Sequence, residues 1–116
     1  MYTLYGIPNC DSVKKARTFL EANSIPYTFH DYKKEGISKA KLTQWSKQLG
    51  WENLINKNST TWKELDEAIK NDVTTQAAAI NVMMEYTSAI KRPIIMKDDA
   101  IVAIRFNEAE YQKVFL

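Results

Sequence analysis

The residue best suited to covalent chemistry in this 116-residue chain is Cys10, its only cysteine. It follows a short segment, residues 2–5, that ends in a Gly6-Ile7-Pro8-Asn9 exit. Since Asn9 is a good N-cap, we expect Cys10 at the first helical position, with its thiol near unpaired backbone N–H groups. Such a position favours the thiolate, which is the nucleophile. A lone cysteine is often a small buried hydrophobe, but this placement favours a reactive thiol.

The charges around Cys10 support the same interpretation. With a helical period of 3.6, Lys14 and Arg17 fall on the side of Cys10, next to an apolar stripe that begins at Val13. Asp11 opposes a thiolate, but we expect the helix end and the cations to outweigh it. Cys10 is therefore predicted to lie between a buried face and a basic one.

Composition excludes several classes of function. The formal charge is only +2, from 16 basic and 14 acidic residues. The chain therefore lacks the excess of basic residues that is typical of nucleic-acid-binding proteins. One cysteine and one histidine, His30, leave too few soft ligands for a zinc or transition-metal site, so we expect no metal and place His30 at a surface strand end. Neither a secretory segment nor a membrane-spanning run is seen, and no internal disulfide is possible, which predicts a reducing cytoplasm.

The pattern of elements predicts one α/β domain over residues 1–116. Residues 2–5, 10–22 and 26–31 read as strand, helix and parallel strand. A helical middle follows, with caps expected at Ser38, Gly50 and a Thr61/Glu64 capping box, and with a further helix over about 75–86. Residues 93–96 and 100–104 read as an antiparallel hairpin, before a helix capped by Asn107. The chain thus divides into a βαβ half (1–31), a helical insertion (32–90) and a ββα half (91–116).

This order of elements resembles the thioredoxin/glutaredoxin-like fold with a helical insertion. Four segments extend the resemblance to the family of arsenate reductases (ArsC) and Spx regulators, and most of all to its YffB-type glutathione-dependent thiol reductases. They are YGIPNCDSVKKAR (5–17), HDY (30–32), TTW (60–62) and IKRPI (90–94).

The resemblance implies roles for individual residues. The nucleophilic cysteine falls on Cys10, a second catalytic group on Arg92, and a proline held in the cis form on Pro93. A guanidinium there can stabilise a thiolate or bind an anionic substrate bidentately, although Arg92 taken alone could make a surface salt bridge instead. Further substrate-binding positions are implied at Asn9, Lys14, Asn56, Lys57 and Arg105.

The chain also departs from two patterns of the family. Arsenate reductases carry a histidine where Gly6 stands, and one of their three oxyanion arginines is replaced by Asn56, for which Lys57 could compensate. The Cys-x-x-Cys switch of Spx would need a second cysteine at Val13. These departures weaken both the arsenate and the Spx interpretation.

The sequence therefore predicts a cytoplasmic monothiol oxidoreductase in which the Cys10 thiolate forms a mixed disulfide with a small oxidised thiol. Since the chain has no resolving cysteine, glutathione is the expected co-substrate and glutathione or glutaredoxin the expected partner. We expect no bound cofactor, no nucleic-acid or membrane partner, and a monomer. The alternatives are a glutaredoxin-coupled arsenate reductase acting on an oxyanion and an Spx-like regulator that binds RNA polymerase.

Overall fold

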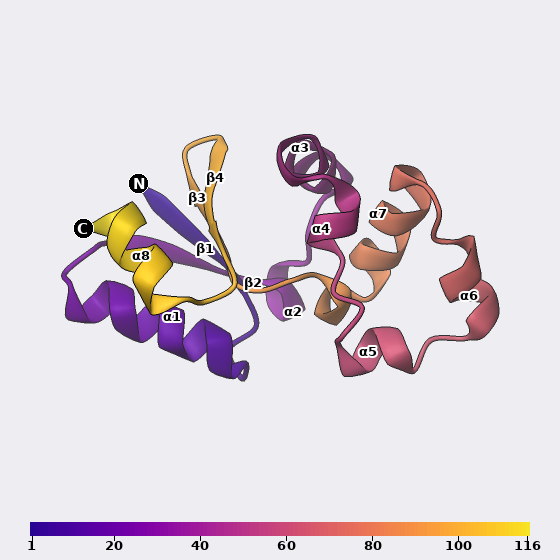
Figure 1. Ribbon diagram of the computed structural model, residues 1–116, viewed down its shortest axis with the longest axis horizontal. Helices are drawn as coiled ribbons and strands as arrows, with labels where there is room; N and C mark the ends of the chain where they lie inside the picture. The colour runs from indigo at the N-terminus through magenta and orange to yellow at the C-terminus, as the bar shows by residue number, and fades with distance from the viewer. The chain divides into compact units, whose positions relative to one another are not determined.

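The computed structural model describes residues 1–116. It divides into two compact units, one formed by Met1–Glu35 with Arg92–Leu116 and the other by Gly36–Lys91. The first unit holds the sheet and the second is helical, as the element labels of Figure 1 show. The predicted order of strand, helix, strand, helical segment, hairpin and helix is confirmed.

The sheet unit contains four strands in the order β2-β1-β3-β4. β1 (Tyr2–Gly6) pairs in parallel with β2 (Tyr27–Asp31) and antiparallel with β3 (Ile94–Lys97). β4 (Ala100–Ile104) completes the predicted hairpin with β3. The register of this hairpin shifts by one residue after Ile95, which is a β-bulge on β4.

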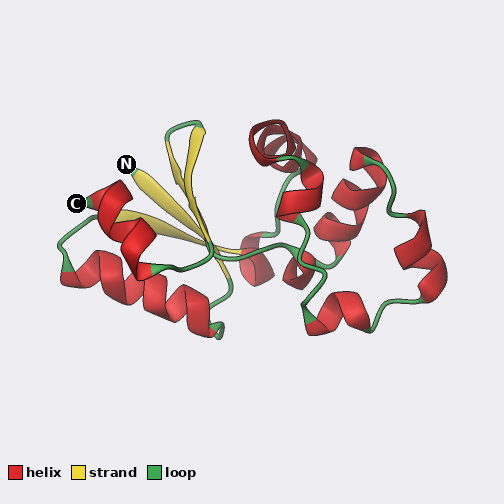
Figure 2. Cartoon of the chain, viewed as in Figure 1, coloured by secondary structure: helices red, strands yellow, loops and turns green.

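One face of the sheet is covered by α1 (Asp11–Ala22) and α8 (Glu108–Phe115), which lie on the same side of the strands in Figure 2. Leu4 of β1 and Ile95 of β3 are register partners, and both are fully buried in this core. The α1 side chains that meet them recur at helical spacing, namely Val13, Ala16 and Leu20. A fully buried leucine contributes about 1.5–3 kcal/mol, so α1 is held firmly on the sheet.

The structure places the start of α1 one residue later than predicted. Cys10 is the N-cap, with φ −97° and ψ 129°, and Asp11 is the first helical residue. The Cys10 N–H donates to the Ile7 carbonyl at 3.3 Å, which closes a turn with Pro8 and Asn9 at its centre. Proline favours the first central position of such a turn, so Asn9 is used in the turn and cannot cap the helix.

The helical unit consists of short helices around its own core. Its elements are α3 (Lys39–Leu49), α4 (Trp51–Leu54), α5 (Thr60–Lys63), α6 (Glu67–Asp72), α7 (Gln76–Glu85) and the 3₁₀ turn η1 (Thr87–Ala89). Its fully buried side chains include Leu42, Trp45, Leu54 and Met83. A further short helix, α2 (Tyr32–Glu35), contacts β2 and belongs to the sheet unit, so the helical unit begins at Gly36.

Most helix boundaries in this unit follow the predicted caps. Ser38 caps α3 by accepting from the Lys41 N–H at 3.1 Å, and Gly50 ends the helix at φ +83°. The predicted Thr61/Glu64 capping box is wrong, because Ser59 caps α5 instead. The Ser59 hydroxyl accepts from the Trp62 N–H at 3.1 Å and donates to the Asn56 carbonyl at 2.8 Å, which fixes it at the helix start.

The longest helices of the chain are too short and too polar to cross a lipid bilayer.

Candidate functional site

The strand register brings the predicted reactive segments of the sheet unit to one end of the sheet. Gly6, the last residue of β1, pairs with Asp31, the last residue of β2. Ile94, the first residue of β3, pairs with Tyr5 on one side and with Ile104 on the other. The residues that follow or precede these positions therefore share this end, which we call the reactive end: Cys10, Tyr32, Arg92, Pro93 and Arg105.

Cys10 is half-buried and packs against the core between α1 and the sheet. Although it stands at the N-cap, its side chain makes no capping hydrogen bond, so the sulfur is not used to close the helix. Asn9 is exposed beside it. Lys14 is exposed one turn further on, and its backbone N–H donates to the Cys10 carbonyl at 2.9 Å.

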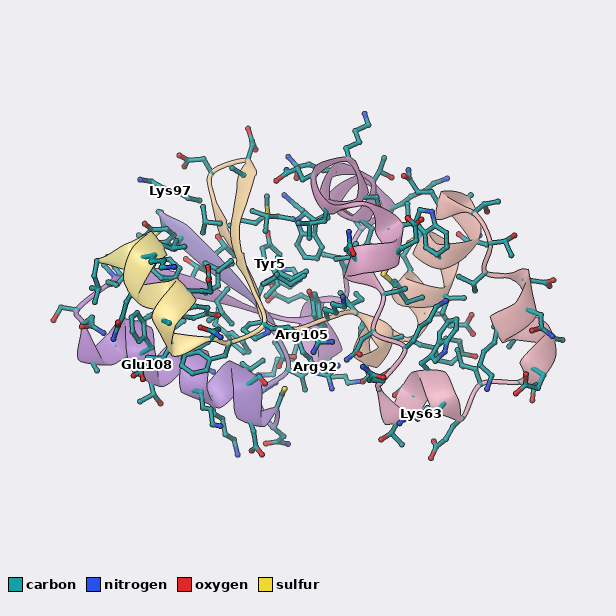
Figure 3. The ribbon with its side chains drawn as sticks, in the orientation of Figure 1. Tyr5, Lys63, Arg92, Lys97, Arg105 and Glu108 are labelled. Carbon is teal, nitrogen blue, oxygen red and sulfur yellow. The ribbon has the colours of Figure 1, made fainter.

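The peptide bond between Arg92 and Pro93 is cis, as expected. The Pro93 carbonyl accepts a hydrogen bond from the Arg105 N–H at 2.7 Å. Arg105 has φ +60°, a left-handed conformation that is uncommon for a residue other than glycine, and its carbonyl accepts from the Tyr111 hydroxyl. The hydrogen bond to Pro93 thus holds Arg105 beside the Arg92–Pro93 segment, while Tyr111 fixes the Arg105 carbonyl. Figure 3 shows both arginines at this end of the sheet.

Sequence reasoning missed Tyr32 as a member of this end. Its side chain is 2% exposed, and its hydroxyl has no hydrogen-bond partner. Burial raises the pKa of Tyr32 well above its ordinary value, the nearby Tyr5 phenol raises this pKa further, and the Arg92 charge lowers it. Tyr32 is therefore a neutral phenol within electrostatic range of Arg92. The sequence did contain a signal for it. Tyr32 directly follows the second of two parallel strands, and parallel strands end at the same edge of the sheet.

His30 is half-buried, contrary to the expected surface position. It pairs with Tyr5 across β1 and β2, so the two rings share one face and lie 4.7 Å apart. Its Nδ1 atom is 3.9 Å from the Glu35 carboxylate, which also accepts from the Asp31 N–H at 3.2 Å. His30 is therefore part of the packing of β2 against α2.

The two departures from the family patterns near Cys10, Gly6 in place of a histidine and Val13 in place of a second cysteine, lie in close contact. Gly6 is buried, and a Cβ atom built on it would lie 2.7 Å from Cγ2 of Val13. A side chain at position 6 therefore competes with the valine side chain at position 13 for the same space. The histidine of the arsenate-reductase pattern does not fit here while Val13 stays in place.

Asn56 and Lys57 lie in the helical unit, where both have contacts of their own. The Asn56 side-chain oxygen accepts from the Asn58 N–H at 3.1 Å, and its backbone N–H donates to the Ala89 carbonyl at 2.6 Å. The Lys57 ammonium lies 5.5 Å from the centre of the Trp62 ring. A role of these two residues in substrate binding stays a prediction.

Comparison with known proteins shows the family. The model of the ArsC family matches residues 5–114. An uncharacterized protein of Haemophilus influenzae is 47% identical over 115 residues, which are 99% of each chain. A solved structure of a protein named YFFB is 39% identical with a TM-score of 0.93 and full coverage of both chains.

Other similar proteins carry other names. An arsenate reductase (ArsC) related protein from Brucella melitensis is 41% identical with a TM-score of 0.77, covering 98% of this chain and 93% of that one. The global transcriptional regulator Spx of Streptococcus mutans is 31% identical over 112 residues, which are 95% of this chain and 80% of that protein. The chain described above belongs to the ArsC family and has the thioredoxin-like fold of its arsenate reductase-like members.

Proposed function

We propose that this protein is a monothiol reductase in which Cys10 exchanges disulfides with glutathione as co-substrate. The observation that carries the proposal is the common position of Cys10, Arg92 and Arg105 at the reactive end, which follows from the strand register and the Arg105–Pro93 hydrogen bond. Membership of the ArsC family supports a thiol-dependent reductase. A cytoplasmic location and a monomeric state stay predictions from the sequence.

In the proposed cycle, the Cys10 thiolate attacks one sulfur of an oxidised thiol and forms a mixed disulfide, while the other sulfur leaves as a thiolate. Glutathione then attacks the mixed disulfide, because Cys10 is the only cysteine of the chain. Arg92 and Arg105 supply fixed positive charge for the carboxylates of glutathione. Asn9 and Lys14 flank Cys10 and are proposed to contact the same substrate.

The test combines a mass measurement with an activity assay. Incubation with oxidised glutathione should add one glutathione to the intact protein, and Cys10→Ser should abolish the addition. Reduced glutathione should then restore the original mass and sustain turnover of a small glutathione mixed disulfide. If the wild-type protein took up no glutathione at any pH between 6 and 9, the proposal would be wrong.

Arsenate reduction is a second candidate, supported by membership of the ArsC family and by the similarity to the arsenate reductase (ArsC) related protein of Brucella melitensis. Arg92 and Arg105 are suited to an oxyanion, but Gly6 and Asn56 replace two groups that the family pattern provides. Removal of one preorganised donor costs about 10² to 10³ in rate. We therefore expect arsenate turnover with glutathione and glutaredoxin to be far slower than turnover of a mixed disulfide.

An Spx-like regulatory role is a third candidate because of the 31% identity to the Streptococcus mutans protein. Val13 fills the position of the second switch cysteine, and its side chain is fully buried. A pull-down with purified RNA polymerase tests this role, and specific retention of polymerase would rank it above the reductase.

A further inference from the structure

Next to the reactive end, the sheet unit carries a groove with a volume of about 660 Å³, of whose lining the proposed chemistry uses only Lys14. One wall is α1, from Lys14 to Ala22 and its cap Asn23, and the other runs from Phe106 along α8 to Leu116. The volume lies in the range of about 300–1,000 Å³ that is typical of ligand pockets. The groove is therefore large enough for a specific occupant.

Both walls of the groove begin beside the reactive end. Lys14 stands one helical turn after Cys10, to which it is linked by its backbone hydrogen bond of 2.9 Å. On the other wall, Phe106 directly follows Arg105, whose N–H donates to Pro93. Cys10 itself does not line the groove, so a ligand joined to Cys10 or to a disulfide beside it would reach the groove along the first turn of α1.

The lining of the groove changes along its length. Lys14 and Lys15 are exposed at the near end, where Phe106 is half-buried, and the edge of the buried Phe19 forms part of the floor. Glu108, labelled in Figure 3, is the one carboxylate of the lining. The groove thus presents two lysine side chains at the end nearer Cys10 and the exposed apolar side chains of Ala22 and Leu116 at the other end.

The dimensions fit a peptide in the extended conformation. Lys14 and Asn23 are nine positions apart on a helix that rises 1.5 Å per residue, so the groove is about 14 Å long. An extended chain covers about 3.3–3.6 Å per residue, which corresponds to roughly four residues. The lysines match an acidic side chain near the disulfide, and Ala22 and Leu116 at the far end match an apolar side chain further along.

We propose that this groove binds the protein segment next to a glutathionylated cysteine, with an acidic residue beside that cysteine and an apolar residue about three positions away. The inference rests on the proposed function and specifies its substrate as a protein rather than a small disulfide. The groove recognises the polypeptide, whereas the arginines of the reactive end receive the glutathione.

The chemical steps balance with glutathione as the reductant. The Cys10 thiolate attacks the glutathione sulfur of the mixed disulfide, which forms a Cys10–glutathione disulfide and breaks the bond to the peptide sulfur. The peptide leaves as a thiolate and takes up a proton. A second glutathione thiolate then attacks the bound glutathione sulfur and releases the Cys10 thiolate and oxidised glutathione. The peptide cysteine is reduced, and one free glutathione is oxidised as it joins the glutathione taken from the peptide in a disulfide.

The test uses synthetic glutathionylated peptides and variants that fill the groove. The peptides place aspartate next to the modified cysteine and leucine three positions away, in both chain directions, with lysine in place of aspartate as the comparison. Thr18 is exposed and lines the groove, so Thr18→Trp should obstruct it. Gln112→Trp does the same from α8. Thr28→Trp is the matched control, since Thr28 is equally exposed on β2 and outside the groove.

We expect kcat/KM of the aspartate peptides to exceed that of their lysine counterparts at least tenfold in one chain direction, a difference of about 1.4 kcal/mol. Thr18→Trp or Gln112→Trp should remove this preference, Thr28→Trp should keep it, and all three should reduce glutathionylated cysteine itself at the wild-type rate. Equal rates for all peptides would overturn the inference while leaving the proposed function intact. A concentration-dependent dimer that Thr18→Trp disrupts would also overturn it, by showing a second copy in the groove.

A binding measurement separates failure of the chemistry from failure of the groove. The same peptides with serine in place of the modified cysteine are titrated into the Cys10→Ser protein and followed by NMR shifts of Phe106 and Leu116. Shifts that Thr18→Trp abolishes would support the groove even if turnover were absent. Unchanged spectra together with unselective turnover would exclude it.

Discussion

The contact between Gly6 and Val13 should control the stability of the segment that carries Cys10. In Gly6→Ala the new Cβ would lie 2.7 Å from Val13 Cγ2 and 3.4 Å from Cγ1. The shorter contact falls about 0.8–1.3 Å below the 3.5–4.0 Å optimum for two carbon atoms. Since Gly6 is outside the left-handed region, the cost comes from packing and not from the backbone.

Overpacking of this kind costs about 1–3 kcal/mol, and the lower entropy of the unfolded alanine chain returns about 0.4–1 kcal/mol. We therefore expect Gly6→Ala to lower the free energy of unfolding by about 1–2 kcal/mol. Val13→Ala alone should cost about 1.5–3 kcal/mol, because a fully buried side chain is cut back. In the double variant the added methyl group occupies the space that valine leaves. The double variant should therefore lose at least about 1 kcal/mol less stability than the sum of the two single variants.

Urea unfolding followed by far-UV circular dichroism measures all four proteins of this cycle. Gly36→Ala is the control, since its Cβ would meet no atom within 4 Å but its φ of +65° strains any side chain. The loss of unfolding free energy in Gly36→Ala should simply add to that of Val13→Ala when the two changes are combined. A Gly6→Ala protein as stable as the wild type, or an additive cycle between positions 6 and 13, would refute the packing argument.

Three further predictions concern Arg92, Tyr32 and Asn56. Arg92→Ala should slow the reaction of Cys10 with oxidised glutathione about ten- to a hundredfold, because a charge-assisted contact of about 1.5–3 kcal/mol is lost. Stopped-flow rates measure this, with Arg92→Lys as the comparison. A wild-type rate in Arg92→Ala would show that Arg92 does not contribute to this reaction. Since the pKa of Tyr32 is raised, the unfolded chain loses a proton above pH 10 that the folded chain retains, so stability falls by up to about 1.4 kcal/mol per pH unit. Tyr32→Phe should remove the contribution of Tyr32 to the dependence of the unfolding free energy on pH, measured by urea unfolding between pH 9 and 11. An unchanged pH dependence would contradict the burial of the phenol. Asn56→Arg should raise arsenate turnover in a coupled glutathione assay, although it removes the bond to the Asn58 N–H, and no gain would show that position 56 does not contribute to oxyanion binding.

The sequence alone determined the features that depend on neighbours along the chain. The helical spacing of Val13, Ala16 and Leu20 predicted the buried face of α1, which the core confirms. The caps at Ser38 and Asn107 were predicted because a capping side chain bonds to a backbone group only a few residues away. The hairpin of β3 and β4 is equally local, since its turn is a short polar segment between two apolar runs.

The sequence analysis also named some residues of the candidate site. Cys10, Arg92 and Pro93 were identified together through the resemblance to the ArsC family, and the strand register places them at the same end of the sheet. The N-cap was misassigned by one residue, because the turn closed by Ile7 and Cys10 competes with capping by Asn9.

Contacts between residues far apart in the chain were decided only by the tertiary structure. No local pattern indicates that the Arg105 N–H donates to the carbonyl of Pro93 on the other side of the hairpin. The buried hydroxyl of Tyr32 depends in the same way on how β1, β2 and the Arg92 segment converge. Periodicity and capping report interactions within a few residues, whereas these contacts exist only after the sheet has set the register of its strands.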